Sequence, residues 1–212
     1  RSYQGANTGR LFADFFTSSN SADAEIKDNL RILRDRAREL SRNDSYISRY
    51  LALMVSNIIG KHGIRVSSKS RNDNNSLDLR ANQLIEKAWS DWGRMGNCTA
   101  NGRMSFLDCQ KLAVESLFRD GEVLIRKIKN KNNPFGFELA FLESDHLDEN
   151  LNDNNLKNGN KIKMGVELNN FGRPVAYHLF KDHPFDQTYQ TENYHIRVPA
   201  EEIIHIFMPT RP

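Results

Sequence analysis

The stretch Phe118-Arg119-Asp120-Gly121-Glu122-Val123-Leu124-Ile125-Arg126 marks a change from helical to strand periodicity. From Val123 onward, side chains follow the two-residue period of a strand, with Val123 and Ile125 alternating with Leu124 and Arg126. Gly121 stands where a helix often ends in a left-handed residue. Before it, apolar side chains recur at the three- and four-residue steps of one helical face, at Phe106, Cys109, Leu112, Ala113 and Leu117. The stretch therefore predicts the point at which a helical layer meets a sheet.

The periodicities on either side of this stretch predict an α+β fold, with a helical N-terminal half packed on a mainly antiparallel sheet from the second half. Four helices are expected, over about 24–41, 45–59, 79–95 and from Ser105 to the stretch above, with a short strand at 63–67. The second half alternates in six segments, around 123–128, 137–141, 162–168, 175–179, 196–198 and 203–207. Of these, 162–181 should form the clearest hairpin. The Asn-rich residues 150–160 are predicted to be a mobile loop.

The widest apolar face belongs to residues 46–59, so this helix is expected to be the most buried. The predicted core comprises Leu51, Val55, Ile58, Trp89, Leu112 and Leu117.

Two regions are expected along the chain, an N-terminal arm over residues 1–22 and one domain over 23–212. The arm carries Phe12, Phe15 and Phe16, which would form an adhesive patch if they were exposed. We expect them to dock, either on a neighbouring subunit or, as the slightly favoured alternative, on their own domain. The first residue is not Met and the chain stops abruptly after Arg211-Pro212, so we expect a piece of a longer protein.

The composition is that of a soluble globular protein, with 38% hydrophobic and 27% charged residues among 212. The net charge of +3 is too small to require a nucleic-acid partner. No run of eighteen apolar residues is present, so no membrane span is predicted. Cys98 and Cys109 are the only cysteines, which fits a reducing cytosol, and a disulfide between them stays open.

The helix Arg31–Arg42 allows two interpretations. Arg31, Arg34 and Arg38 could contact DNA phosphates or a neighbouring subunit, which makes a nucleic-acid-binding module the alternative function. The favoured interpretation is a solvated face on which Asp35 and Glu39 pair with the arginines, because acidic and basic side chains interleave there.

Motifs that would indicate catalysis are missing from the sequence, which has neither a glycine-rich phosphate loop nor a nucleophile elbow. Glu143, Asp145 and Asp148 could bind Mg²⁺ in a metal-dependent hydrolase, but a solvated turn is favoured. A histidine metal site is also conceivable but not favoured, at His178, His183, His195 and His205. We therefore predict no catalytic residue, no cofactor and no structural divalent ion at Asp145.

Eight segments, in order, resemble the lambda-like family of portal proteins of tailed bacteriophages. They include Arg36–Asp44 with the following helix to Gly60, Asp120-Gly121-Glu122-Val123, Leu142–Leu147, Gly172–His178 and Val198–Phe207. The loop after Asn150 departs from the family in its richness in Asn. The residues that carry the resemblance, read as structural, include Arg38, Asn43, Gly60, Gly121, Glu122, Gly172, Arg173, Pro174, Pro199 and His205.

The resemblance implies the N-terminal part of a portal subunit, largely its wing region, with the stem, clip and tunnel elements beyond residue 212. It implies a structural role in a ring, usually of twelve subunits, at one capsid vertex through which double-stranded DNA is packaged and ejected. The implied partners are terminase, head-tail connector and capsid or scaffold protein. The implied location is the virion, and the bacterial cytoplasm during assembly. ATP hydrolysis belongs to the terminase, so no catalytic residue is carried over.

Overall fold

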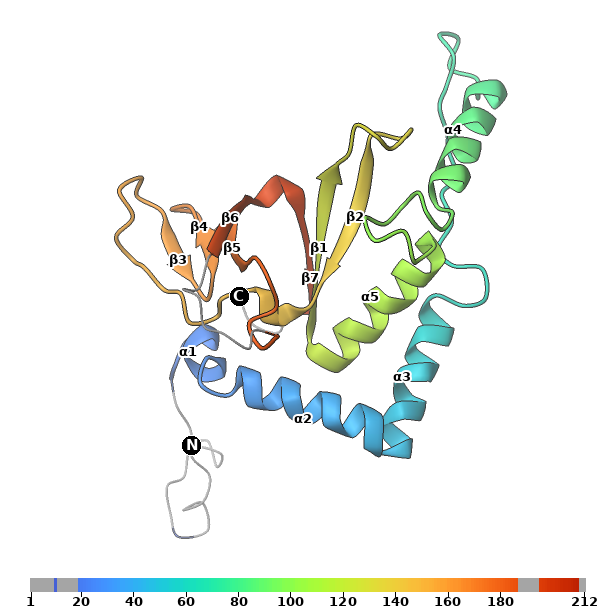
Figure 1. The fold of residues 1–212 in the computed structure, drawn as a ribbon. Coiled ribbons are helices and arrows are strands. Elements are labelled where there is room, and N and C mark those ends of the chain that lie inside the picture. Colours follow the sequence, from blue (N-terminus) through green and yellow to red (C-terminus); the bar gives the residue numbers. More distant parts are fainter. Residues whose placement is uncertain (1–9, 11–18, 187–194, 210–212) are drawn as a thin grey trace, which may run out of the picture.

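The computed structural model describes residue 10 and residues 19–186 and 195–209 (Figure 1). Helices occupy the first half of this described part and strands the second, which confirms the α+β class. The helices are α1 (Ala22–Ile26), α2 (Leu30–Asn43), α3 (Ser45–Ile58), α4 (Leu79–Trp92) and α5 (Phe106–Asp120). Over these residues, no helix has the length and apolarity needed to cross a bilayer. The aromatic arm residues Phe12, Phe15 and Phe16 lie outside the described residues.

The strands form two antiparallel sheets rather than the single sheet expected. The first has the order β2-β1-β7, built from β1 (Glu122–Lys129), β2 (Phe137–Leu142) and β7 (Ile203–Phe207). The second has the order β3-β4-β5-β6, built from β3 (Lys161–Lys163), β4 (Val166–Leu168), β5 (Pro174–Phe180) and β6 (His195–Pro199). Short 3₁₀ turns, η3 (Ser144–His146) and η4 (Ala200–Glu202), lead out of β2 and into β7.

The predicted junction between helix and sheet is confirmed. Gly121 ends α5 with φ 87°, and its N–H donates to the carbonyl of Leu117 at 3.1 Å. This position favours glycine because other L-residues are strained in the left-handed conformation. The next residue, Glu122, begins β1, the central strand of its sheet. At the other end of α5, Ser105 and Asp108 form the expected capping box.

One continuous helix over 24–41 was expected, and this is wrong, because the chain turns at residues 27–29 between α1 and α2 (Figure 1). Asp28 and Asn29 are poor helix formers that favour turns, and the Asn29 N–H donates to Ile26 at 2.9 Å. The strand expected at 63–67 is also absent. There the backbone N–H and C=O of Ile64 bond to the side-chain amide of Gln110 instead of to another strand.

The hairpin expected over 162–181 is confirmed for β4 and β5, which pair across the turn at 169–173. Residues 161–163 instead form a separate strand, β3, because Met164 (φ 48°) and Gly165 (φ 79°) reverse the chain. The Asn-rich segment before β3 is irregular, as expected. It is nevertheless anchored, since the amides of Asn158 and Asn160 donate to the buried carboxylate of Glu167 at 3.2 and 2.6 Å.

Two buried clusters share strand β1. On one face, Val123 and Ile125 pack with α4, α5 and β2 in a cluster that includes Trp92, Cys98, Cys109 and Leu139. On the other face, Leu124 packs between the two sheets in a cluster that includes Leu147, Tyr177, Leu179, Val198 and Ile203. The period-two alternation of β1 therefore connects both cores through one strand.

The predicted core residues are only partly confirmed. Leu51 is buried at 7% exposure, but Ile58 is 47% exposed and its neighbour Ile59 is buried instead. The remaining four are half-buried, namely Val55, Trp89, Leu112 and Leu117. The expectation that α3 is the most buried helix is wrong, since Tyr46 is 85% exposed. In the described part of the chain, helix α3 packs mainly against α2 and α5, and its apolar face is wider than they cover.

We expect Leu124→Ala to lower the free energy of unfolding by about 2–5 kcal/mol, because Leu124 is fully buried at 0% exposure. The matched control is Leu84→Ala on α4, where the side chain is 60% exposed and the loss should stay below about 1 kcal/mol. Urea denaturation of both variants measures the difference. Equal losses would contradict the assignment of Leu124 to the core between the sheets.

Candidate functional site

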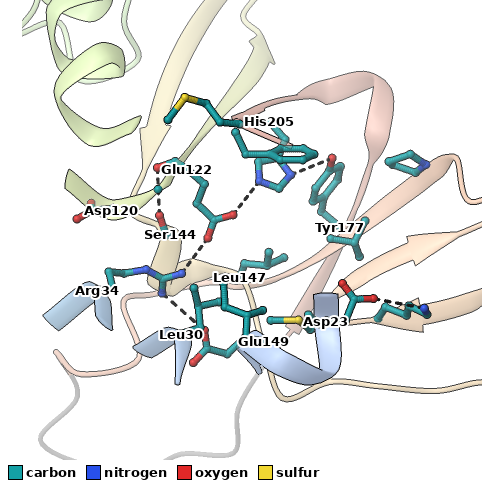
Figure 2. Close-up of a pocket in the computed structure, with 18 of the residues that line it drawn as sticks. Asp23, Leu30, Arg34, Asp120, Glu122, Ser144, Leu147, Glu149, Tyr177 and His205 are labelled. Atoms are coloured by element: carbon teal, nitrogen blue, oxygen red, sulfur yellow. Dashed lines mark hydrogen bonds and ion pairs between the residues drawn. The ribbon is translucent and has the colours of Figure 1, made fainter. Parts of the chain in front are cut away.

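Helix α2 places a buried arginine against acidic residues from three other segments. Arg34 is 4% exposed, and its Nη2 lies 2.8 Å from Oε1 of Glu122 at the start of β1. Its Nη1 lies 3.6 Å from Asp145 in η3. The same atom lies 3.7 Å from Glu149, which Figure 2 shows below Arg34. A guanidinium offers several donors in one plane, which suits it to bridge several carboxylates.

Arg38, one helical turn further along α2, extends this arrangement. Its Nε lies 3.0 Å from Oδ1 of Asp120, and its Nη2 lies 2.6 Å from Oδ2 of Asp145. Asp120 also accepts from Arg119 at 3.0 Å. These side chains form what we call the arginine–carboxylate network, made up of Arg34, Arg38, Arg119, Asp120, Glu122, Asp145 and Glu149. The network ties α2 to the end of α5, the start of β1 and η3.

The second oxygen of Glu122 begins a chain of contacts that reaches the second sheet through His205. Its Oε2 lies 2.8 Å from Nε2 of His205 on β7. The other ring nitrogen of His205 lies 3.5 Å from the hydroxyl of Tyr177 on β5. Figure 2 shows Glu122 between Arg34 and His205. Glu122 and His205 together thus connect α2 with strands of both sheets.

The network shifts the acidities of its carboxyl groups in two directions. Burial raises the pKa of Asp120 and Asp145, but hydrogen bonds and charge from the arginines outweigh it, so both pKa values lie below the ordinary 3.8. For Glu149 burial dominates, since the attraction of Arg34 is opposed by Asp145 and Glu122, and its pKa lies above the ordinary 4.5. Arg38 has a raised pKa, because its bonds to Asp120 and Asp145 outweigh its burial.

Beside the network lies a cavity of about 520 Å³. Its walls come from α1, α2 and both sheets, and about half of the lining side chains are apolar, including Ile26, Leu30, Leu147, Val166 and Leu168. Half of the residues singled out for the family resemblance line it, namely Gly121, Glu122, Gly172, Pro174 and His205.

The other five residues singled out for the resemblance lie elsewhere. Arg38 belongs to the network, and Asn43 closes α2 with a side-chain bond to Glu39 at 2.8 Å. Gly60 follows α3 with φ 66°, Arg173 lies in the β4–β5 turn, and Pro199 ends β6. Each of these four positions is an element end or a turn, which suits a structural role.

The arginines of α2 do not form the open basic surface that a nucleic-acid module requires. Arg34 and Arg38 are enclosed by the network, whose acids lie outside the helix, so the expected pairing with Asp35 and Glu39 is not what engages them. Arg31 is exposed and lies 4.3 Å over the ring of Phe185. Periodicity could not reveal the partners of Arg34 and Arg38, because they are distant in sequence. Asp120 lies 82 residues from Arg38, and Glu122 lies 88 residues from Arg34.

The histidines do not gather into a metal site in the described part of the chain. His178, His183, His195 and His205 each lie near a different carboxylate, respectively Glu167, Glu143, Asp148 and Glu122.

The three acids of the hydrolase hypothesis, Glu143, Asp145 and Asp148, do not gather around one point. Ligand atoms of Glu143, Asp145 and His183 lie within 4.8 Å of one another, whereas Asp148 pairs with His195 at 2.8 Å. Asp145 already pairs with Arg34 and Arg38, whose positive charges disfavour a nearby divalent ion. The absence of a divalent ion at Asp145 stays a prediction.

The sequence profile of the family described as "Phage portal protein, lambda family" matches residues 8–212. This chain belongs to the lambda family of phage portal proteins. It is also 39% identical over 215 residues to the "Probable portal protein" of Halomonas phage phiHAP-1, a match that covers the whole of this chain. The lambda-family chain described here spans 41% of the length of that relative.

The raised pKa of Glu149 has a consequence for stability. A group whose pKa is higher folded than unfolded favours the fold when protonated, and this contribution is lost as the pH rises through the folded value. We therefore expect Glu149→Gln to raise the free energy of unfolding at pH 7, with the gain disappearing below about pH 4, where Glu is protonated in both states.

Chemical denaturation between pH 3.5 and 7 measures this effect. The control is Glu201→Gln, at an exposed position in η4, which should change stability by less than about 0.5 kcal/mol at either pH. A loss of stability at pH 7 in Glu149→Gln would show that attraction to Arg34 exceeds the cost of burial.

Proposed function

We propose that this chain is part of a structural portal subunit that forms a ring at one capsid vertex, through which double-stranded DNA is packaged and ejected. The observation that carries the proposal is the match of the lambda-family portal profile to residues 8–212. The 39% identity to a relative named a probable portal protein supports it.

The 212 residues would contribute an N-terminal arm (1–22) and a wing-like domain (23–212). Stem, clip and tunnel elements would come from the rest of the subunit. This division agrees with the share of the phage relative that the chain spans, 41%.

The proposed partners are other copies of the subunit, twelve to a ring, together with terminase, head-tail connector and capsid or scaffold protein. The subunit would assemble in the bacterial cytoplasm and remain in the virion. We propose no enzymatic activity and no cofactor. In support, the charged groups of the described site pair with one another, and Arg34, Asp120 and Asp145 are buried by the fold itself.

Helix α4 offers surface that a neighbouring subunit could cover. It projects away from the sheets (Figure 1) and is anchored at its C-terminal end, where Trp92 packs in the core and its indole N–H donates to Phe137 at 3.2 Å. Nearer the N-terminal end of the helix, the apolar side chains of Leu79, Leu84 and Ile85 are exposed. Exposed apolar groups gathered on one element are typical of interaction sites.

Electron microscopy and native mass spectrometry of the full-length subunit test the proposal. We expect a closed ring with an axial channel, and twelve subunits by mass. The 212-residue chain alone is the comparison. It should sediment as a monomer or weak oligomer at micromolar concentration, because losing part of an interface lowers affinity steeply. A full-length protein that stays monomeric under assembly conditions, or that forms no central channel, would contradict the proposed function.

A further inference from the structure

Several apolar side chains that line the cavity beside the arginine–carboxylate network are partly exposed to solvent. Ile26 of α1 and the C-terminal residues Phe207 and Met208 line it and are each 40% exposed or more. Val166 and Leu168 of β4 also line it and are half-buried. Its volume of about 520 Å³ falls within the range of pockets that enclose drug-sized groups.

The carboxylate of Glu122 and several other polar groups at the cavity already have partners, although Nε of Arg34 is buried without one. Glu122 receives both Arg34 and His205, and the hydroxyl of Tyr177 lies beside His205. At the rim, Lys163 pairs with Asp23 at 3.3 Å (Figure 2). A charged occupant would have to displace these pairs, whereas an apolar one would only remove apolar surface from water. The cavity chemistry therefore favours apolar side chains over phosphate, nucleotide or metal.

A segment with this chemistry precedes the cavity in the sequence. Residues 11–16 read Leu-Phe-Ala-Asp-Phe-Phe, so four of six side chains are large and apolar. Phe16 precedes Asp23, which lies on the cavity rim, by seven residues. Helix α1 begins at Ala22, and the six steps from Phe16 to Ala22 reach at most about 20–22 Å, enough for these aromatic side chains to return to the cavity of their own chain.

We propose that residues 11–16 dock in this cavity, with phenyl rings of Phe12, Phe15 and Phe16 covering its apolar walls. A phenylalanine side chain buries a large apolar area, which offsets the entropy lost on ordering a short segment. The short connection to α1 favours the cavity of the same chain, because it holds the segment at a high effective concentration. The docked segment would hold α1 against β4. This contact does not require that the subunit assembles into a ring.

Disulfide trapping in the otherwise intact chain tests the contact. Phe15→Cys combined with Met164→Cys places one thiol on the segment and one on the cavity wall. The native Cys98 and Cys109 are buried, and burial raises the pKa of both thiols, so they should react slowly. Under mild oxidation with copper phenanthroline, we expect most chains to form an intrachain disulfide, detected by peptide mass spectrometry.

The matched control pairs Phe15→Cys with Leu84→Cys, at an exposed position on the projecting helix α4, and should leave both thiols free. Equal trapping with both partners, or no trapping with either, would overturn the proposal. A disulfide between positions 15 and 164 of different chains would overturn docking within one chain and assign the cavity to a neighbouring copy.

A thermodynamic cycle gives an independent readout. Replacing Phe12, Phe15 and Phe16 together by Ser should lower Tm by at least about 2–4 °C, the shift expected for 1 kcal/mol in a chain of this size. The loss should shrink in the background of Leu168→Trp, which fills the cavity. An unchanged loss in that background would show that the aromatic residues act elsewhere.

Discussion

The position of α2 depends on the burial of one guanidinium group. Taking the Arg34 charge out of water is costly, and the cost is recovered only when carboxylates surround it in the fold. Those carboxylates come from the start of β1, from η3 and from the chain just beyond it. The helix can therefore occupy its place only when β1 and η3 occupy theirs, and this couples the helical half of the chain to the strand half.

Strand β1 makes that coupling effective because it belongs to both cores. Val123 and Ile125 face the cluster under α4 and α5, whereas Leu124 faces the cluster between the sheets. Gly121 and Glu122 stand directly before these residues, so the turn out of α5 and the network fix how β1 enters both cores. Gly121 and Glu122, two of the residues that carry the portal resemblance, thus help to fix the architecture of this chain.

Local patterns predicted the elements that local interactions determine. The capping box of Ser105, the left-handed Gly121 and the β4–β5 turn each depend on residues within a few positions of one another. The break at Met164 was hidden because the alternation of apolar residues continues through it. Amphipathic patterns show which face of a helix is apolar but not whether this chain covers it, which explains the exposed face of α4 and the exposed Tyr46.

The candidate site was harder to predict, because its geometry joins residues from distant segments. Resemblance singled out Arg38, Glu122 and His205, but nothing in periodicity indicated that they gather around one network and its cavity. Interleaved acids on α2 suggested pairing within the helix, whereas the buried arginines pair with acids fixed by the tertiary fold. Buried charge needs such partners, and periodicity alone does not identify which distant acids supply them.

A double-mutant cycle between Arg38 and Asp145, whose charged atoms lie 2.6 Å apart, tests the coupling of the two halves most directly. The free energies of unfolding of Arg38→Ala, Asp145→Ala and the double variant give the interaction energy of the pair. Because Asp145 is buried, we expect a coupling of about 1–3 kcal/mol, with each single variant losing more than half of what the double variant loses. A coupling near zero would show that α2 and η3 are held by other contacts and would contradict the central role of the network.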